Sequence, residues 1–438
     1  MSVHQDLAGL LHGRDFRRLF AVRLVGQAGD GMFQVGLATL FFFSPESQGT
    51  AASIAVAFTV LLAPFTLVGP WAGVLLDRWR RRQVLVRVNV ARVAVTLLIG
   101  AWVLLWGIGP AVYVLALLNL SLNRFVLAAL SASLPRVVSR EQLLTANSVV
   151  PTFGAGAAAL GGVVGLLLGL VMDAGTSKDA ASLAAAAVFF AVSAGVAARF
   201  GVDRLGPGDL ADADAVRQRL ARLGRGLVEG GRALARIGTP AQALAVMGVH
   251  RLFYGVTFVA SILLSRNLLA DPADPDAGLA VFASVLAASA VGFGAAVLTT
   301  PVLARRTGAQ VWVVLCLLLA GVAQLVLLSS VRLPVLLVCA ALLGLAAQGA
   351  KIAVDTIVQR DTPDELRGRA FALYDVVYNS AFIAAAAVAA VTLPDSGYSR
   401  PVFAVLAAGY LLTAVVFWLR GLRSPRRAQR RGVTSPDS

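Results

Sequence analysis

The chain alternates between long apolar stretches and short polar segments that carry most of its charge. An apolar stretch of about 18 or more residues is long enough to cross the hydrocarbon core of a membrane as a helix. By this criterion we predict an all-α integral membrane protein with twelve transmembrane helices. The predicted spans are residues 20–43, 53–76, 84–106, 110–131, 149–172, 180–202, 242–265, 278–303, 310–330, 333–354, 370–393 and 398–420.

The overall composition also favours a membrane protein over a soluble domain. Of the 438 residues, 58% are apolar and only 14% are charged, and the mean hydropathy is +0.79. A net charge of +15 would suggest nucleic-acid binding in a soluble protein, but here the arginines lie in short gaps between spans. We therefore expect contact with membrane lipid and no nucleic-acid partner.

The basic residues predict which side of the membrane each gap faces. Most Lys and Arg residues fall on the side that carries both termini, and the opposite side carries only Lys178, Arg266, Arg332 and Arg400. Lys and Arg concentrate in cytoplasmic loops. We therefore expect a multi-pass protein of the inner cell membrane with both termini in the cytoplasm, an arrangement that an even number of spans allows.

Weak internal similarity divides the spans into two six-helix pseudo-repeat bundles. When the halves are aligned without gaps, Arg81 and Arg82 fall on Arg305 and Arg306, and Gly31 falls on Gly255. Parallel halves of this kind occur in transporters. We predict an N-terminal bundle at 1–202, a cytoplasmic linker at 203–241, a C-terminal bundle at 242–420 and a basic cytoplasmic tail at 421–438.

The linker has the pattern of a basic amphipathic helix. Apolar residues recur at helical spacing from Val216 to Ile237, and arginines fall mostly between them. A helix of this type lies on an anionic membrane surface. A regulatory partner site is the alternative interpretation of this segment.

The strongest local motif lies between the second and third spans, where the chain reads GPWAGVLLDRWRRR from Gly69 to Arg82. The pattern Gly-x-x-x-Asp-Arg-x-x-Arg-Arg resembles the signature loop of the major facilitator superfamily, with Arg80 where that family usually has glycine. The residues that carry the resemblance are Gly73, Asp77, Arg78, Arg81 and Arg82. The resemblance implies an inner gate, in which Asp77 lies at the positive N-terminus of the eleventh span and the last two arginines tie neighbouring loops.

Shorter motifs resemble the exporter branch of this superfamily, which includes siderophore exporters and macrolide-efflux proteins. One is Gly29-Asp30-Gly31 in the first span, and another begins at Leu134 after the fourth span. The fifth span is glycine-rich, as in the superfamily's antiporters, but it lacks their Gly-Pro step, and close helix packing alone explains its glycines. The resemblance implies proton-driven export of a small amphipathic molecule, such as a drug, siderophore or metabolite, by alternating access.

Ionisable residues inside the spans are candidates for function because lipid makes them costly. Asp30 lies about ten residues, or about 15 Å, into the first span. A desolvated carboxylate there could bind and release a proton, and a static pair with a neighbouring arginine is the alternative. Lys351 and Asp355 share a helix face, where a plain ion pair at the water boundary is the alternative. The proton-coupling candidates are Asp30, Lys351, Asp355 and Asp375.

Polar residues on spans that line the central cavity of the superfamily form a second set of candidates. The first and seventh spans carry such residues at similar depth, and a structural pair of Arg251 with Asp30 would also fit. Arg87 and Arg92 of the third span could belong to the inner-gate network. The substrate-binding candidates are Gln27, Gln34, Asn123, Arg124, His250, Arg251, Tyr254 and Gln348.

The sequence contains no nucleophile–base set, phosphate-binding loop or metal-ligand cluster, so we expect no enzyme, cofactor or metal. Cys316 and Cys339 fall toward opposite ends of successive spans, which predicts that they form no disulfide. We expect a monomer that binds a small-molecule substrate and protons. The alternatives are an importer or a lysolipid-type flippase, and a non-transporting membrane sensor or scaffold.

Overall fold

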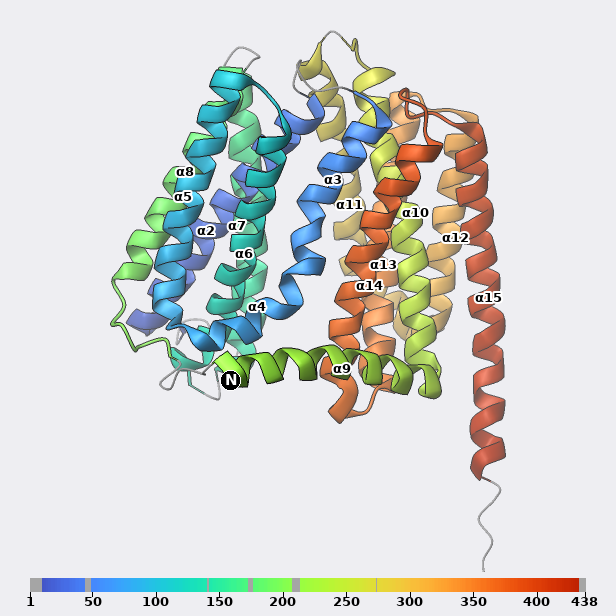
Figure 1. The fold of residues 1–438 in the computed structure, drawn as a ribbon. Helices are drawn as coiled ribbons and strands as arrows, with labels where there is room; N and C mark the ends of the chain where they lie inside the picture. Colours follow the sequence, from blue (N-terminus) through green and yellow to red (C-terminus); the bar gives the residue numbers. More distant parts are fainter. Residues whose placement is uncertain are drawn as a thin grey trace, which may run out of the picture. The chain divides into compact units, whose positions relative to one another are not determined.

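The computed structural model describes residues 10–43, 49–139, 142–171, 176–206, 213–272 and 274–432, and in these ranges it consists of helices and short connections (Figure 1). The helices form two compact units. Unit 1 contains the described residues of 1–48 and 59–223, and unit 2 contains those of 49–58 and 224–438. Two helices, α3 (Ala51–Leu67) and α9 (Ala213–Ile237), therefore contribute residues to both units.

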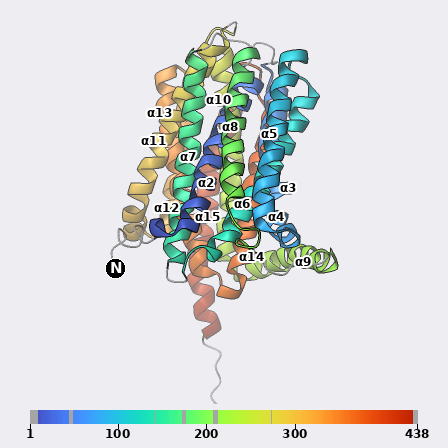
Figure 2. The ribbon, with the colours of Figure 1, turned by 90° about the vertical axis from the view of Figure 1, so that its left-hand side faces the viewer.

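Unit 1 is built from helices that pack along their lengths. Its helices, apart from the shared ones, are α2 (Arg14–Ala38), α4 (Gly69–Leu75), α5 (Arg81–Trp106), α6 (Pro110–Ser133), α7 (Leu143–Val171) and α8 (Thr176–Ala198), with the short helices η1 (Thr39–Phe43), η2 (Leu76–Arg78) and η3 (Leu134–Arg136). Helix α2 packs against α7 and α8, as Figure 2 shows, and α5 packs against α6 and α8. The unit therefore surrounds α2 with α7 and α8 and joins α6 to the bundle through α5.

Unit 2 repeats this kind of packing with its own helices, α10 (Thr239–Asn267), α11 (Pro275–Thr307), α12 (Ala309–Ser329), α13 (Leu333–Asp361), α14 (Asp364–Thr392) and α15 (Arg400–Gly432). Helix α10 packs against α13 and α14, α11 against α13, and α12 against α13 and α15.

The residues at the helix ends explain where some helices of unit 2 begin. Gly238, at φ 95°, separates α9 from α10 in a left-handed conformation that glycine adopts easily. The Asp274 carboxylate accepts a hydrogen bond from Ala277 N at 3.0 Å and caps α11.

Ten helices of the described chain are long and apolar enough to cross a membrane. Several of them expose large apolar side chains, such as Leu160 (68% exposed), Leu298 (77%) and Val391 (83%). A surface of this kind suits lipid rather than water. The ten helices correspond to the third through twelfth predicted spans. The first two predicted spans are not among them, because α2 carries several charged and amide residues and α3 is only 17 residues long.

The second predicted span, 53–76, is wrong as a single helix. Helix α3 ends at Leu67, and α4 begins at Gly69 with a proline in its first turn. Proline has no backbone N–H and disfavours helical geometry in the residue before it, so the helix is interrupted there. Several other boundaries also differ from the prediction, and the largest differences are that α13 runs on to Asp361 and α15 to Gly432. Residues 433–438 of the predicted tail lie outside the described residues.

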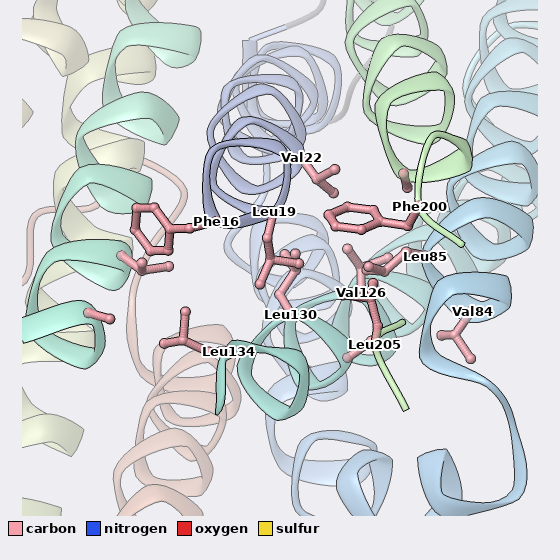
Figure 3. Close-up of a cluster of buried hydrophobic side chains, with 14 of the residues drawn as sticks. Phe16, Leu19, Val22, Val84, Leu85, Val126, Leu130, Leu134, Phe200 and Leu205 are labelled. Atoms are coloured by element: carbon pink, nitrogen blue, oxygen red, sulfur yellow. The ribbon is translucent and has the colours of Figure 1, made fainter. Parts of the chain in front are cut away.

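A cluster of buried apolar side chains holds one end of unit 1 together (Figure 3). Phe16 and Leu19 of α2 pack in this cluster with Leu85 of α5, Leu130 of α6 and Phe200, which follows α8. All five are at most 4% exposed. The cluster fixes the ends of four helices beside the arginine-rich loop, and it therefore positions the site described next.

Candidate functional site

Asp30 and Arg92 form a buried ion pair between α2 and α5. Asp30 is 5% exposed and Arg92 is 0% exposed. Arg92 Nη2 donates to Asp30 Oδ1, and Arg92 Nε donates to Asn119 Oδ1 of α6 at 3.2 Å. Asn119 Nδ2 donates in turn to Thr96 Oγ1 at 2.7 Å. The ring of Phe190 from α8 covers the guanidinium, with 3.7 Å from Arg92 Cζ to the ring centroid. Side chains of four helices thus enclose the pair.

The partner of Asp30 is Arg92, and not Arg251, which the sequence had suggested as an alternative. Arg92 was assigned from the sequence to the gate network together with Arg87. In the structure Arg92 is fully buried, whereas Arg87 is exposed. The two positions are five residues apart on α5, and at about 100° per residue they point about 140° away from each other. Helical spacing was therefore the signal that could have separated them.

Other sequence-predicted residues of unit 1 divide between the buried pair and its surroundings. Asn123 and Arg124 of α6 lie close enough to Asp30 to interact with its carboxylate. Gln27 is one turn away on α2, where its Oε1 accepts a hydrogen bond from Arg23 Nε at 2.9 Å. Gln34 is exposed. The structure therefore brings Asn123 and Arg124, but not Gln34, to the carboxylate.

In unit 2, Arg251 of α10 lies against aromatic rings. Its Cζ atom is 3.6 Å from the ring centroid of Phe382, 4.1 Å from that of Tyr378 and 5.6 Å from that of Tyr254. A guanidinium over an aromatic face is attracted by the negative face of the ring. Within the described part of the chain Arg251 forms no ion pair, and its buried Nε atom has no hydrogen-bond partner. The charge is thus stabilised by rings and not by a carboxylate.

His250 and Tyr254 connect α10 to two neighbouring helices. His250 is 1% exposed, and its Nδ1 atom lies 3.2 Å from the hydroxyl of Tyr410 in α15. The hydroxyl of Tyr254 lies 3.3 Å from that of Ser289 in α11. A small pocket, lined in part by Tyr254 and Ser289, opens beside this contact. The His250 side chain is therefore buried between helices of unit 2, while that of Tyr254 borders a cavity.

The remaining candidates gather where α13 meets α14. Lys351 Nζ lies 2.8 Å from Asp355 Oδ2 one turn along α13, with side chains 34% and 26% exposed. The ammonium is 5.5 Å from the ring centroid of Tyr374. Asp375 is exposed and interacts electrostatically with Lys351 and Asp355. Gln348 is partly buried one turn before Lys351. This cluster is much more open than the Asp30 pair.

The signature loop ties the start of α5 to other helix ends of unit 1. Arg81 Nη1 donates to the carbonyl oxygens of Ala132, at 2.8 Å, and Leu205, at 3.1 Å. Arg82 Nη2 donates to the carbonyl oxygen at the end of α8 at 2.8 Å. Arg78 is exposed, and a Cβ atom built on Gly73 would meet no atom within 4 Å. The side chain of Asp77 lies outside the described residues.

Glycines let the helices around the site approach backbone to backbone. A Cβ atom on Gly31 of α2 would lie 1.8 Å from the carbonyl oxygen of Ala158, and one on Gly161 of α7 would lie 1.9 Å from that of Ala28. In unit 2, a Cβ atom on Gly292 of α11 would lie 1.9 Å from the carbonyl oxygen of Ala341 in α13. The prediction that close packing explains the glycines of the fifth span is confirmed for Gly161. Both cysteines are buried and free, in agreement with the prediction for them.

Comparisons with known proteins agree on one family. Residues 243–436 match the family model of the Major Facilitator Superfamily. Over 411 residues the chain is 36% identical to an uncharacterized MFS-type transporter of Mycobacterium tuberculosis, and equally to one of Mycobacterium bovis, with 93% of this chain and 92% of each relative covered.

Solved transporters share the fold. A POT family transporter in complex with a thioalcohol-conjugated peptide has a TM-score of 0.67 at 10% identity, covering 94% of this chain and 96% of that one. A nucleoside transporter has a TM-score of 0.62 at 14% identity, covering 92% and 98%. At such low identity the likeness concerns the fold alone.

Proposed function

Because the chain belongs to the major facilitator superfamily and is a membrane transporter, we propose that it is a proton-coupled exporter of a small amphipathic molecule. In such a transporter, movement of one half of the protein against the other exposes the substrate alternately to the two sides of the membrane. The motif around Asp30 supports the export direction, because it resembles the exporter branch of the superfamily. The substrate class is a drug, siderophore or metabolite.

The observation that carries the proposal is the buried ion pair of Asp30 with Arg92. The free-energy cost of removing two charges from water is offset only while the two charges remain paired. A carboxylate can take up a proton, whereas an arginine stays charged. Protonation of Asp30 would leave the charge of Arg92 uncompensated and favour a different arrangement of α2 and α5. Loss of the proton would restore the pair, so the pair has the two states that coupling requires.

The other proton-coupling candidates support this role less well. Lys351 and Asp355 are about one-third and one-quarter exposed, so water can stabilise both charges whether or not they pair. Asp375 is exposed. A change of protonation at these residues has a smaller energetic consequence than at Asp30. We therefore assign coupling to Asp30.

The signature loop supports a gating role for the cytoplasmic end of unit 1. Arg81 and Arg82 donate hydrogen bonds to carbonyl oxygens at three other helix ends or loops. The loop therefore holds the neighbouring ends of α5, α6 and α8 together, so that they would move as one group. Asp77 is the acidic member of the motif, and we assign it to the gate on the resemblance alone. The roles of Gly73 and Arg78 rest on the same resemblance.

The proposal includes twelve spans in two six-helix bundles, with both termini in the cytoplasm of the inner membrane and the protein acting as a monomer. Helix α2 with η1 would form the first span, and α3 with α4 the second. The excess of arginine in gaps on one side supports the orientation. The helix α9 between the bundles would lie on the inner leaflet through its apolar face.

The test is transport into proteoliposomes with and without an imposed pH gradient. A substrate is first identified by screening drugs, siderophores and metabolites for a shift in the unfolding temperature of the purified protein. Asp30→Asn keeps the shape of the side chain but removes its titration. We expect this variant to lose gradient-driven accumulation and to retain energy-independent exchange.

Asp355→Asn is the matched control, since it removes a carboxylate from a span without touching the buried pair. It should still accumulate substrate in response to the gradient. If Asp30→Asn also concentrates substrate, Asp30 is a structural residue and the assignment of coupling to it is wrong. If the unmodified protein transports equally with and without the gradient, proton coupling as a whole is wrong.

A further inference from the structure

A groove on the surface of unit 1 lies between α5 and α6, next to the signature loop. Its cavity volume is about 260 Å³. One wall is formed by Trp79 and Phe125, whose rings meet edge to face with centroids 6.4 Å apart. Val88 and Leu122 add an apolar floor, and Arg87 is the charged side chain among the lining residues. The groove is therefore apolar with one cation.

No residue that the structure describes is an internal partner that would explain the position of Arg87. It is exposed, and it forms no ion pair or hydrogen bond with any residue in the described ranges. It lies six residues, or about 9 Å, inside α5, one of the helices apolar enough to cross a membrane. An arginine at such a position is unfavourable unless its guanidinium reaches a polar or anionic group.

The groove continues two apolar helix faces that suit lipid. On α5, Val90 (55% exposed), Leu97 (49%) and Leu104 (54%) follow Arg87 at helical spacing on the same face. On α6, Leu118 is 45% exposed and precedes the groove residue Leu122 by one turn. Both faces thus lead from the middle of the unit toward Arg87.

We propose that this groove binds one anionic phospholipid. The lipid phosphate would lie on Arg87, and the acyl chains would follow the exposed faces of α5 and α6. Trp79 is 45% exposed, and tryptophan is enriched where acyl chains meet head groups. The loop beside the groove is predicted to face the cytoplasm, and the cytoplasmic leaflet carries the anionic lipids. The lining residue Gln83 is a further donor for the head group.

A second basic groove, in unit 2, shows what distinguishes the first. It is lined by Arg305 and Arg360 at the ends of α11 and α13. Arg305 Nε donates to the carbonyl oxygen of Pro301 at 2.8 Å, and Arg360 Nε lies 2.6 Å from Asp361 Oδ1. These guanidinium groups already have internal partners. Among the described residues, the unit 2 groove therefore differs from the first in that the charge of Arg360 is balanced by a carboxylate and the guanidinium of Arg305 is held by a backbone carbonyl oxygen.

Quenching of tryptophan fluorescence by brominated lipids tests the proposal directly, because Trp79 lies in the groove. The protein is reconstituted into phosphatidylcholine vesicles that contain either brominated phosphatidylglycerol or brominated phosphatidylcholine at equal fraction. The chain has 6 Trp residues, so the Trp79 signal is taken as the difference between the protein and its Trp79→Phe variant. We expect brominated phosphatidylglycerol to quench this signal markedly more than brominated phosphatidylcholine does at the same fraction.

Three variants sharpen the result. Arg87→Gln should weaken the preference for phosphatidylglycerol about fivefold, the effect of one basic residue at a membrane surface. Arg87→Lys keeps the charge and should retain most of the preference. Arg306→Gln removes an exposed arginine outside both grooves and should leave the preference unchanged.

Equal quenching by the two lipids would overturn the proposal, and so would an Arg87→Gln variant with an unchanged preference. Soluble glycerol phosphate at millimolar concentration provides a further arm. If it abolishes the excess quenching, the groove binds a soluble anion and the lipid assignment is wrong. Unfolding temperatures of the variants show whether each remains folded.

Discussion

Arg92 in unit 1 and Arg251 in unit 2 both lie within helical bundles, but their surroundings differ in kind. Arg92 is fully buried and pairs with the carboxylate of Asp30. Arg251 is partly buried and lies against the rings of Tyr378 and Phe382, with no ion pair to any described residue. A carboxylate can be neutralised by one proton, whereas these rings keep the same charge near neutral pH.

The internal alignment of the two halves sharpens this contrast. Tyr254 stands at the position of Asp30, and Cys316 stands at the position of Arg92. Both members of the ion pair are therefore replaced in the second half. Among the described residues, a fully buried pair of arginine with a carboxylate therefore occurs in unit 1 and not in unit 2, and our proposal places the proton-sensitive element at this pair.

The largest effect is expected from Arg92→Met, which leaves the Asp30 carboxylate buried without its counter-charge. Breaking a buried pair in this way costs about 3 to 5 kcal/mol of unfolding free energy. The double variant Asp30→Asn with Arg92→Met is neutral at both positions and should recover most of the loss. The measurement is denaturant unfolding of the purified protein in mixed micelles. Purely additive losses in the double variant would show that the two side chains are not coupled.

Substitution of the closely packed glycines should destabilise both units to a similar extent, whereas substitution of the buried arginines should not. Gly161→Ala in unit 1 and Gly292→Ala in unit 2 each place a methyl group within 2 Å of a carbonyl oxygen, and overpacking costs about 1 to 3 kcal/mol. The controls are Gly156→Ala and Gly294→Ala, where a Cβ atom meets nothing within 4 Å. They should be neutral or stabilising by up to about 1 kcal/mol. Controls that destabilise as much would show that general loss of helix flexibility, not contact, is responsible.

Arg251→Gln should destabilise less than Arg92→Met. It removes cation–π contacts worth about 0.5 to 2 kcal/mol, but it leaves no described carboxylate without a partner. Tyr378→Leu should cost stability in the unmodified protein and less in the Arg251→Gln background. The same denaturant titration measures both. A loss as large as that of Arg92→Met would reveal an anionic partner of Arg251 and remove the contrast between the units.

The smallest effect is expected from Asp355→Asn. Its ion pair with Lys351 is partly exposed, and exposed helical pairs of this spacing contribute about 0.5 kcal/mol or less. The change in unfolding free energy should shrink further at high salt, which screens exposed charges. A loss above that of Arg251→Gln would place Asp355 among the buried carboxylates and weaken the choice of Asp30 as the coupling residue.

Local composition determined much of the architecture. Apolar length alone located the ten described helices that are long and apolar enough to cross a membrane, and several of their ends coincide with residues that stop or start helices. The fourth predicted span began at Pro110, where α6 begins, and the tenth began at Leu333, where α13 begins. The signature loop between the second and third spans indicated the superfamily that the comparisons show. These features are readable from the chain because helix length, proline and loop motifs act over short distances in sequence.

The partner of each buried charge was decided by tertiary structure. Helical spacing indicated that Asp30 lies on a polar face, but several arginines in the spans were equally available to it. Packing of α2, α5, α6 and α8 selected Arg92 and enclosed the pair with Asn119 and Phe190. The same packing turned Arg87 outward into a groove. Periodicity specifies the face of a helix, whereas the neighbour on that face depends on contacts between segments far apart in the sequence.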